Sequence, residues 1–360
     1  ADGWETFRWR HDYPLETYAV TLNVAPYVVI EQPLELEGLD APVPMAWSVL
    51  PSDEDKARLQ FAELPGVLEA FGAAFGPWPV PQSKVALVQT PFWGMEHSTA
   101  IAYGSSFPAW IERHGGDDPY APRNRWFDFI LVHETAHEWW GKAVSAADWG
   151  DFWLHEGFAT YAEGVFVEHR DGREAADRFF AQMRRSVPRR GALYRGRGAT
   201  SGEAYSPILY GKGGLVLNTL RHYVDDDEAW WHALRTFNLR HRYGNATTDD
   251  FQAVLEEVTG REWGRFFAEW VHGSGWPRVR GSVRRGGEGL VLEAVNDPPA
   301  PDGFLVPLDL EWIEDEQPRS CRLWLEPGES RLEVACEAPP RDVRVMHLER
   351  VLGKHDLRVE

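Results

Sequence analysis

The sequence lacks the features of membrane-spanning and nucleic-acid-binding proteins. No apolar run approaches the length of about eighteen residues that a membrane-spanning helix needs. We find no uninterrupted run of Lys and Arg of the kind that neutralises phosphates, and the formal net charge is -19. The first ten residues, Ala1 to Arg10, contain no apolar segment typical of a secretion signal. We therefore expect no membrane span and no nucleic-acid partner.

Cysteine is scarce, with two in 360 residues, Cys321 and Cys336. A hairpin turning at Pro327 to Ser330 would place the two residues opposite each other, in a register that permits a disulfide. A disulfide would favour an extracytoplasmic location, periplasmic or secreted, because cytosolic thiols are kept reduced. Two reduced cysteines in a small β domain are the alternative, and they would fit the cytoplasm as well.

The chain is rich in residues that form a core. Hydrophobic residues make up 43% of the sequence, and 18 residues are tryptophan, enough apolar surface to offset the entropy lost on folding. A single core stops growing near about 250 to 300 residues, so we expect two or three domains. The patterning favours a short β segment at 1–42, a mostly helical part at 43–277 and a small β-sandwich at 278–360.

Periodicity predicts the secondary structure within these parts. Alternating apolar residues predict a strand over 16–24, with Tyr18, Val20, Leu22 and Val24 on one face. Helices are predicted over about 53–75, 126–140, 152–167, 208–223, 227–239, 249–258 and 263–272, and further strands over 44–50, 84–89, 289–295, 304–313, 321–326, 331–336 and 343–347.

One motif indicates a specific chemistry: His133-Glu134-Thr135-Ala136-His137. Side chains four residues apart share a helix face, so both imidazoles can reach one metal ion, with Glu134 beside it to take a proton from a bound water. A catalytic zinc needs three protein ligands and an open position, and Glu156 on the next predicted helix is the candidate for the third ligand. Between His137 and Glu156 lie 18 residues, enough to end one helix and return antiparallel. The sequence therefore predicts one zinc ion per chain.

The alternative for this motif is a pair of ordinary polar histidines on a helix face. The residues on both sides are apolar, Phe129 to Val132 before the motif and Trp139 with Trp140 after it. Two histidines and a glutamate buried together would be costly unless they were paired or bound to a metal. The flanking residues thus favour the metal site.

Several separated blocks resemble the aminopeptidase N-like zinc metallopeptidases, which are gluzincins. The blocks are Gly94 to His97, similar to the exopeptidase motif; Trp153 to Ala159, around the third zinc ligand; Ala204 to Gly213, which holds the catalytic tyrosine; and Trp270 to Pro277, which closes the catalytic domain. The resemblance implies an α+β fold with a thermolysin-like catalytic domain, mostly helical with a small sheet. A remnant of the family's N-terminal β domain would precede it, and an Ig-like β-sandwich would follow.

The resemblance also implies roles for single residues. Glu96 would bind the free α-amine of a peptide, and Gly94 with Met95 would lie along the substrate backbone. Tyr210 would donate its hydroxyl to the oxyanion, and Tyr205 would assist in the same pocket. A solvated loop carboxylate is the alternative for Glu96, and a buried structural tyrosine is the alternative for Tyr205.

Two positions depart from the family pattern. His97 and His155 stand where the family has Asn, and both keep a side chain that forms hydrogen bonds. Neither of these two departures removes a catalytic group.

Glu163, two turns after Glu156, could orient a zinc ligand or be a surface acid, and we place it outside the site.

These assignments predict a zinc-dependent aminopeptidase acting on peptides with a free N-terminus. A gluzincin endopeptidase is one alternative, which the proposed role of Glu96 disfavours. A catalytically silent binding scaffold of the same fold is another, which the complete set of ligands, Glu134 and Tyr210 disfavours. The sequence does not predict the oligomeric state.

Overall fold

The computed structural model describes residues 3–118, 121–286, 289–297 and 303–360. The chain folds into two compact units. Unit 1 comprises Ala1–Ser145 and Arg235–Ala246, and unit 2 comprises Ala146–Leu234 and Thr247–Glu360. The division into domains at 42 and 277 stays a prediction.

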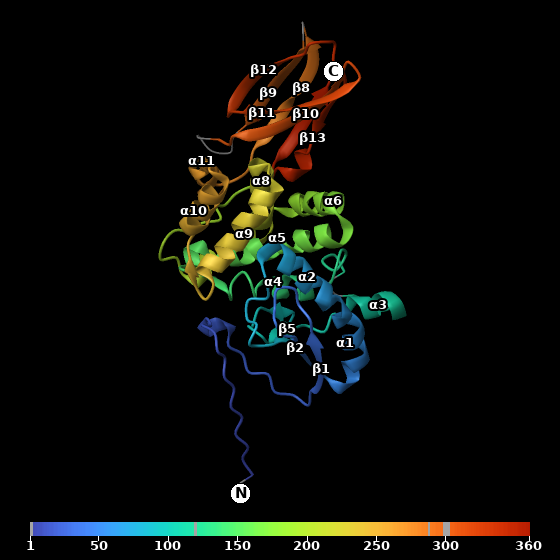
Figure 1. Cartoon of the computed structure of the whole chain (residues 1–360), viewed down its shortest axis with the longest axis vertical. Helices are drawn as coiled ribbons and strands as arrows, with labels where there is room; N and C mark the ends of the chain where they lie inside the picture. The colour runs from blue at the N-terminus through green and yellow to red at the C-terminus, as the bar shows by residue number, and fades with distance from the viewer. Residues whose placement is uncertain (1–2, 119–120, 287–288, 298–302) are drawn as a thin grey trace. The chain divides into compact units, whose positions relative to one another are not determined.

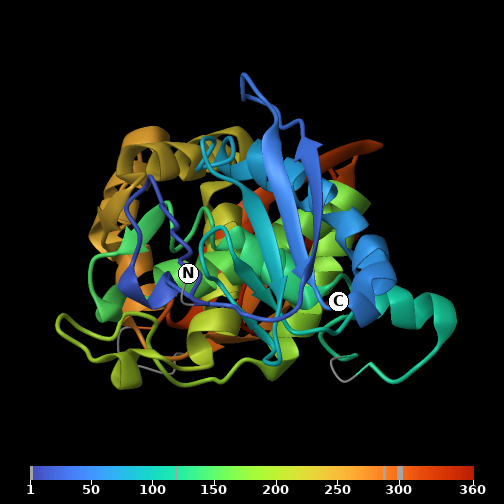
Figure 2. The ribbon, with the colours of Figure 1, turned by 90° about the horizontal axis from the view of Figure 1, so that it is seen from below.

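A five-stranded sheet forms the centre of unit 1. Its strands are β1 (Val28–Leu34), β2 (Val43–Val49), β3 (Val85–Gln89), β4 (Gly94–Met95) and β5 (Ile101–Tyr103). In the order β1-β2-β3-β5-β4, the inner strands β2, β3 and β5 run parallel, and each edge strand runs antiparallel to its neighbour. Figure 2 shows blue β1 and β2 beside the cyan strands. The edge strand β4 carries the first two residues of the predicted exopeptidase motif.

Four helices of unit 1 accompany this sheet: α1 (Glu54–Gln60), α2 (Leu64–Phe75), α3 (Pro108–His114) and α4 (Phe129–Ala136). The helix predicted over 53–75 is split by a 3-10 turn at Phe61–Glu63, just before Pro65, which lies in the first turn of α2 where its missing N–H breaks no bond. The helix predicted over 126–140 starts later, because the Asp128 side chain caps it by accepting a hydrogen bond from the Leu131 amide at 3.1 Å.

The strand predicted over 16–24 is wrong. The chain forms a short 3-10 helix at Thr17–Ala19, and residues 20–27 form neither helix nor strand. Val20, Leu22 and Val24 are exposed, and only Ala19 of this segment is fully buried. An alternating pattern becomes a strand only where a neighbouring strand supplies hydrogen bonds, and the five-stranded sheet begins with β1 instead.

Helices dominate the first part of unit 2. They are α5 (Trp153–Asp171), α6 (Arg173–Met183), α7 (Ser201–Ala204), α8 (Ile208–Val224), α10 (Thr248–Thr259) and α11 (Gly264–Phe267), while α9 (Asp227–His241) has residues in both units. The predicted start of α10 is confirmed, because Thr247 and Asp250 form a reciprocal capping box. None of the helices in the described part of the chain combines the length and the apolar character that a membrane crossing requires.

Two glycines allow α5 and α8 to approach closely. A methyl group added at Gly213 would lie 2.6 Å from the Cα of Gly157, and one added at Gly157 would lie 3.1 Å from the Cα of Gly213. No side chain fits at this crossing without moving the backbone. The contact places the N-terminal part of α8 beside the segment of α5 that carries Glu156.

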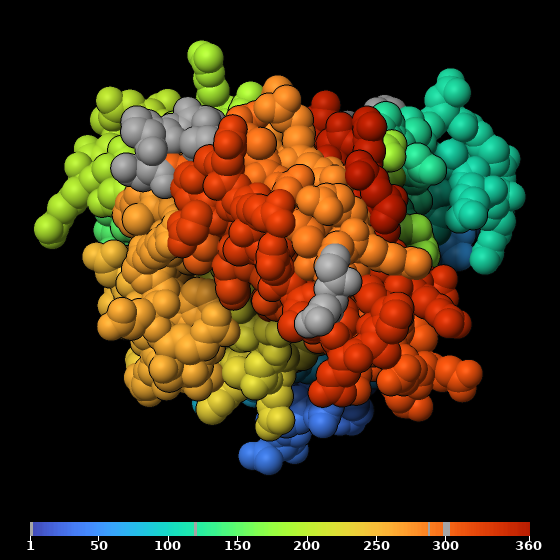
Figure 3. Space-filling view, turned by 90° about the horizontal axis from the view of Figure 1, so that it is seen from above, coloured from blue at the N-terminus to red at the C-terminus, as the bar shows by residue number. Residues whose placement is uncertain are grey.

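The second part of unit 2 consists of strands, as predicted. They are β8 (Arg278–Gly286), β9 (Gly289–Asp297), β10 (Val306–Glu314), β11 (Gln317–Leu325), β12 (Gly328–Ala335), β13 (Arg341–Met346) and β14 (Lys354–Val359). They form one sheet in the order β12-β9-β8-β14 and a second in the order β11-β10-β13. In Figure 1 these strands lie together beyond α6 and α8, and in Figure 3 their orange and red atoms cover the upper face of unit 2. The Ig-like topology stays a prediction.

The predicted hairpin between the two cysteines is wrong. Cys321 lies on β11 opposite Leu310 of β10, whereas β12, which ends one residue before Cys336, pairs with β9 in the other sheet. Both cysteines are free thiols, and burial raises the pKa of each. The turn residues Pro327 to Ser330 thus connect two sheets, a topology that alternation and turn signals do not distinguish from a hairpin.

Candidate active site

Helix α4 carries the predicted metal-binding motif within the core of unit 1. His133, Glu134 and His137 are at most 7% exposed, and the Nε2 atoms of the two histidines lie 3.3 Å apart. The Nδ1 atom of His137 lies 2.9 Å from the carbonyl oxygen of Trp140. A carbonyl oxygen can only accept, so Nδ1 carries the proton, and Nε2 of the neutral ring keeps its lone pair. The helix therefore offers two neighbouring imidazole nitrogens of the type that binds zinc.

The loop after β4 brings the predicted amine-binding residue next to this helix. Glu96 is 5% exposed, and ligand atoms of Glu96, Glu134 and His137 lie within 4.8 Å of one another. Gly94 packs against the same group, because a methyl group added there would lie 2.8 Å from Oε1 of Glu134. Strand β4 and helix α4 together thus place two carboxylates and one imidazole of the predicted site side by side.

Glu138 holds this loop and was not predicted as a site residue. Its carboxylate accepts a hydrogen bond from the Thr99 amide at 2.7 Å and one from the Ser98 hydroxyl at 3.3 Å. Thr99 has a φ of 54°, in the left-handed region that a residue with a branched side chain rarely adopts. Burial raises the pKa of Glu138, and the Thr99 amide opposes that rise. Glu138, which directly follows the predicted zinc-binding motif, thus fixes the loop that carries Glu96.

A buried lysine and a distant tyrosine also contact the Glu96 region. Lys142 is 7% exposed, and its Nζ atom lies 3.0 Å from the hydroxyl oxygen of Tyr18. The Tyr18 hydroxyl donates to Oε1 of Glu96 at 3.0 Å. Burial lowers the pKa of Lys142, and the charges of Glu96 and Glu16 oppose that shift. Sequence reasoning missed both residues, because Tyr18 is 78 positions from Glu96 and no local motif links them.

In unit 2, the predicted third ligand lies beside both predicted tyrosines. Glu156 is 2% exposed on α5, and its Oε1 atom accepts hydrogen bonds from Tyr210 at 2.9 Å and from Tyr205 at 3.2 Å. The two hydroxyl groups also lie 2.8 Å apart. Burial raises the pKa of Tyr210, and the nearby Glu156 carboxylate raises it further, so this phenol stays protonated at neutral pH.

The two histidines that replace family asparagines have different environments. His155 is fully buried, and its Nε2 accepts a hydrogen bond from the Ala146 amide at 2.8 Å, a bond that a neutral imidazole makes. His97 lies in the loop beside Glu96, where burial lowers its pKa. His155 therefore holds the chain segment that leads into α5, much as an asparagine oxygen could.

The predicted site residues divide between the two units. Unit 1 brings together Gly94, Met95, Glu96, His133, Glu134 and His137, and unit 2 brings together Glu156, Tyr205 and Tyr210. Within each unit, residues that are far apart in the sequence meet in one cluster. Each cluster is built around buried carboxylates, as expected of groups that act on a charged substrate or hold a cation. Tyr205 is 53% exposed, so the alternative of a buried structural tyrosine is wrong.

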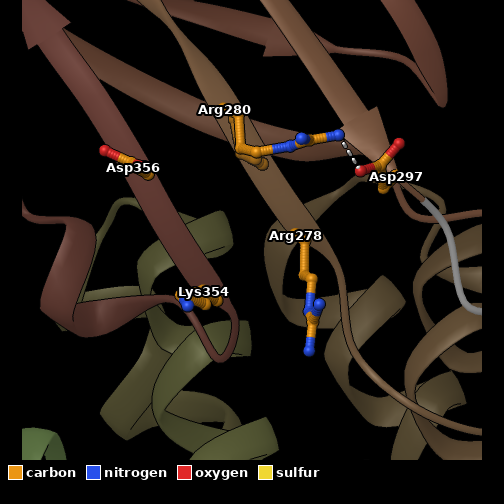
Figure 4. A pocket seen from close by; sticks show the side chains of 6 residues that line it. Arg278, Arg280, Asp297, Lys354 and Asp356 are labelled. Carbon is orange, nitrogen blue, oxygen red and sulfur yellow. Dashed lines mark hydrogen bonds and ion pairs between the residues drawn. The ribbon is translucent and has the colours of Figure 1, made fainter.

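A separate hollow in unit 2 has a different character. It measures about 230 Å³ and is lined by strands β8, β9 and β14, with Arg280 paired to Asp297 at 2.5 Å. Figure 4 shows Arg278 and Lys354 on adjacent strands at its edge. Its charged side chains are exposed to solvent, where ion pairs contribute little. None of the predicted site residues lines this hollow.

Comparison with known proteins finds relatives among the aminopeptidases. Aminopeptidase M1 of Arabidopsis thaliana is 26% identical over 221 residues, covering 58% of this chain and 24% of that protein. Glutamyl aminopeptidase of Bos taurus is 23% identical over 335 residues, covering 88% of this chain and 34% of that protein. The chain thus spans about a quarter to a third of these two relatives.

A solved structure shares the fold. The structure of Legionella pneumophila aminopeptidase A in complex with aspartic acid matches with a TM-score of 0.78 at 14% sequence identity, covering 97% of this chain and 40% of that one. The model of the peptidase family M1 domain matches residues 65–270, more than half of the chain. The chain therefore belongs to peptidase family M1, the aminopeptidase N-like metallopeptidases that its motifs resemble.

Proposed function

We propose that the chain is a zinc-dependent aminopeptidase that hydrolyses the N-terminal bond of peptides with a free α-amine. One observation carries the proposal: Glu96, Glu134 and His137 meet within 4.8 Å in unit 1. An amine-binding carboxylate this close to the base would place the first peptide bond, and no later one, at the reacting position. The aminopeptidase relatives support the same activity.

The donor groups fit a zinc ion. His137 keeps the Nε2 lone pair that a metal needs, and His133 Nε2 lies beside it at 3.3 Å. Glu156 would be the third ligand, completing the two-histidine, one-glutamate set typical of catalytic zinc. The ion, when bound, would polarise the scissile carbonyl and make a water molecule more acidic.

The remaining groups have separate tasks in this proposal. Glu134 would accept a proton from the attacking water and return it to the leaving amine. Tyr210, which stays protonated, would donate its hydroxyl to the developing oxyanion, and Tyr205 would hold that hydroxyl in place through their 2.8 Å contact. Gly94 and Met95 on edge strand β4 would pair with the substrate backbone.

Substrate and metal dependence test the proposal directly. We expect a panel of aminoacyl chromogenic substrates to be hydrolysed, the activity to be lost with a chelator, and zinc to restore it. Peptides with an acetylated N-terminus should be poor substrates, because Glu96 would face an uncharged group. Cleavage of acetylated peptides at internal bonds would instead indicate an endopeptidase, and metal-independent binding without turnover would indicate a scaffold.

Replacing Glu96 with Gln should raise KM for aminoacyl substrates by about 10- to 100-fold, because a hydrogen bond to a charged group contributes about 1.5 to 3 kcal/mol. The measurement is steady-state kinetics with a matched pair of free and acetylated substrates. Glu69→Gln, on helix α2 of the same unit, serves as the control and should leave KM unchanged. A variant that still discriminates between the two substrates as the wild type does would contradict the role of Glu96.

Replacing Tyr210 with Phe should lower kcat by about 100- to 1,000-fold, the usual cost of losing one oxyanion donor. KM should change little, since the ground-state carbonyl needs this hydroxyl less. Tyr194→Phe, in the same unit, is the control and should keep wild-type kcat. If Tyr210→Phe loses activity through KM alone, the hydroxyl binds substrate and does not act on the transition state.

A further inference from the structure

The hydroxyl of Tyr18 links two charged groups in unit 1. It lies 3.0 Å from Nζ of Lys142 and 3.0 Å from Oε1 of Glu96, and Nζ lies 4.2 Å from the centre of the Tyr18 ring. Tyr18 belongs to the 3-10 turn at Thr17–Ala19, whose Ala19 is buried. The N-terminal segment therefore reaches the loop that carries Glu96.

The direction of these hydrogen bonds follows from the groups themselves. An ammonium can only donate, so the Tyr18 oxygen accepts from Lys142, and the phenol donates its single proton to a carboxylate. Glu16 lies beside the same hydroxyl and the same ammonium, and burial raises its pKa. The hydroxyl donates to Glu96, and the Lys142 charge makes the phenol a better donor by drawing electron density from its oxygen.

We propose that Tyr18 and Lys142 are positioning residues for Glu96, the residue that would bind the substrate amine; this inference rests on the proposed function. Lys142 holds the phenol of Tyr18, and the phenol holds Oε1 of Glu96, so that the second oxygen is presented to the substrate amine. A carboxylate fixed at one oxygen loses less rotational freedom when the amine binds, and binding is correspondingly tighter.

Charge balance supports the same assignment. The Lys142 ammonium faces four carboxylates of unit 1, those of Glu16, Glu96, Glu134 and Glu138. Without it, these buried carboxylates would repel one another. The lysine thus offsets this repulsion beside Glu96, while the tyrosine fixes the position of the Glu96 carboxylate.

Tyr18→Phe tests the proposal, because it deletes the hydroxyl and keeps the ring beneath Lys142. The probes are alanine hydroxamate, which has an α-amine, and propanoic hydroxamate, which lacks one. In the wild type the amine should make the first inhibitor bind more tightly. In Tyr18→Phe we expect the Ki of alanine hydroxamate to rise about tenfold and that of propanoic hydroxamate to stay within about twofold.

Tyr27→Phe is the matched control. Its hydroxyl donates to the carbonyl oxygen of Gln89, on strand β3 of the same unit, at 2.8 Å. This variant should leave both Ki values unchanged. Lys142→Met should act in the same direction as Tyr18→Phe, and the double variant should lose less than the sum of the two single effects, because both act through one oxygen of Glu96.

The outcomes separate this inference from the proposed function. Equal weakening of both inhibitors in Tyr18→Phe, or an unchanged pair of Ki values, would overturn the positioning role while leaving the aminopeptidase intact. Strictly additive effects of the two substitutions would overturn the link between Lys142 and Tyr18. A wild type that binds both inhibitors equally would overturn amine recognition by Glu96, and the positioning role with it.

Discussion

Glu134→Gln should lower kcat by about 100- to 10,000-fold, the contribution that a well-placed general base makes. The amide has nearly the same shape but cannot accept the proton of the attacking water. Glu134 lies within 4.8 Å of both Glu96 and His137, close to where the first peptide bond would bind. The measurement is single-turnover and steady-state kinetics on one aminoacyl substrate, with KM expected to change little.

Zinc content separates the two ways in which this variant could fail. If Glu134 is the base and not a ligand, metal analysis should still find about one zinc per chain after extensive dialysis. A variant with near wild-type turnover would remove Glu134 from the reaction. A variant that had lost its zinc would instead make Glu134 part of the metal site.

Glu156→Gln should weaken zinc binding by more than about 100-fold. Loss of an outer-shell partner alone typically costs about 10- to 100-fold, and removal of a charged ligand should cost more. The Glu156 carboxylate is buried and accepts hydrogen bonds from two tyrosines, so its charge is held in a defined place. Competition with a chromogenic chelator measures the affinity, and activity should return only at high zinc.

Glu163→Gln is the comparison variant for this prediction. Glu163 lies on the same helix and is similarly buried, at 4% exposure. We expect its zinc affinity to fall by no more than about tenfold, as for a residue that at most orients a ligand. Equal losses in the two variants would show that the loss reflects a disturbed helix α5, and Glu156 would then not be identified as a ligand.

Much of the helical structure follows from the sequence, because helices depend on local signals. The start of α10 at Thr247 and Asp250 is an example, since cap and periodicity agree within a few residues. Helix α6 was missed although its first residue follows Gly172 directly, a glycine with a φ of 86° that ends α5. The predicted helix over 152–167 ended before Gly172, and the residues after this glycine were not predicted as a helix.

Strands were predicted less well, because a strand needs a hydrogen-bonded partner strand, and the local sequence does not indicate which segment that partner is. Residues 16–24 alternate in polarity but form no strand. Strands β8 and β14 carry many charges and yet pair in parallel over six residues. The cysteine hairpin was wrong for the same reason, because β11 and β12 join different sheets. Register and sheet order are tertiary properties.

The candidate site shows the same division between local and distant information. His133 and His137 are four residues apart, about one helical turn, so the sequence alone predicts that they lie close together, with Glu134 beside them. Glu138 and Lys142 follow in the next turns, but their contacts with Thr99 and Tyr18 depend on how the loop and the N-terminal segment fold back. Sequence motifs therefore predict the proposed reacting groups, and the folded structure identifies the groups that contact them.

The glycine pair at the crossing of α5 and α8 restricts how this protein can change. Glu156 precedes Gly157, and Tyr210 lies three residues before Gly213. The distance between the Glu156 carboxylate and the Tyr210 phenol therefore depends on how closely the two helix backbones approach at these glycines. Even alanine at either glycine would force the helices apart and stretch the 2.9 Å contact between them. Substitutions that change the position of Tyr210 must therefore lie elsewhere on the two helices, because neither glycine at the crossing can be replaced without moving the backbone.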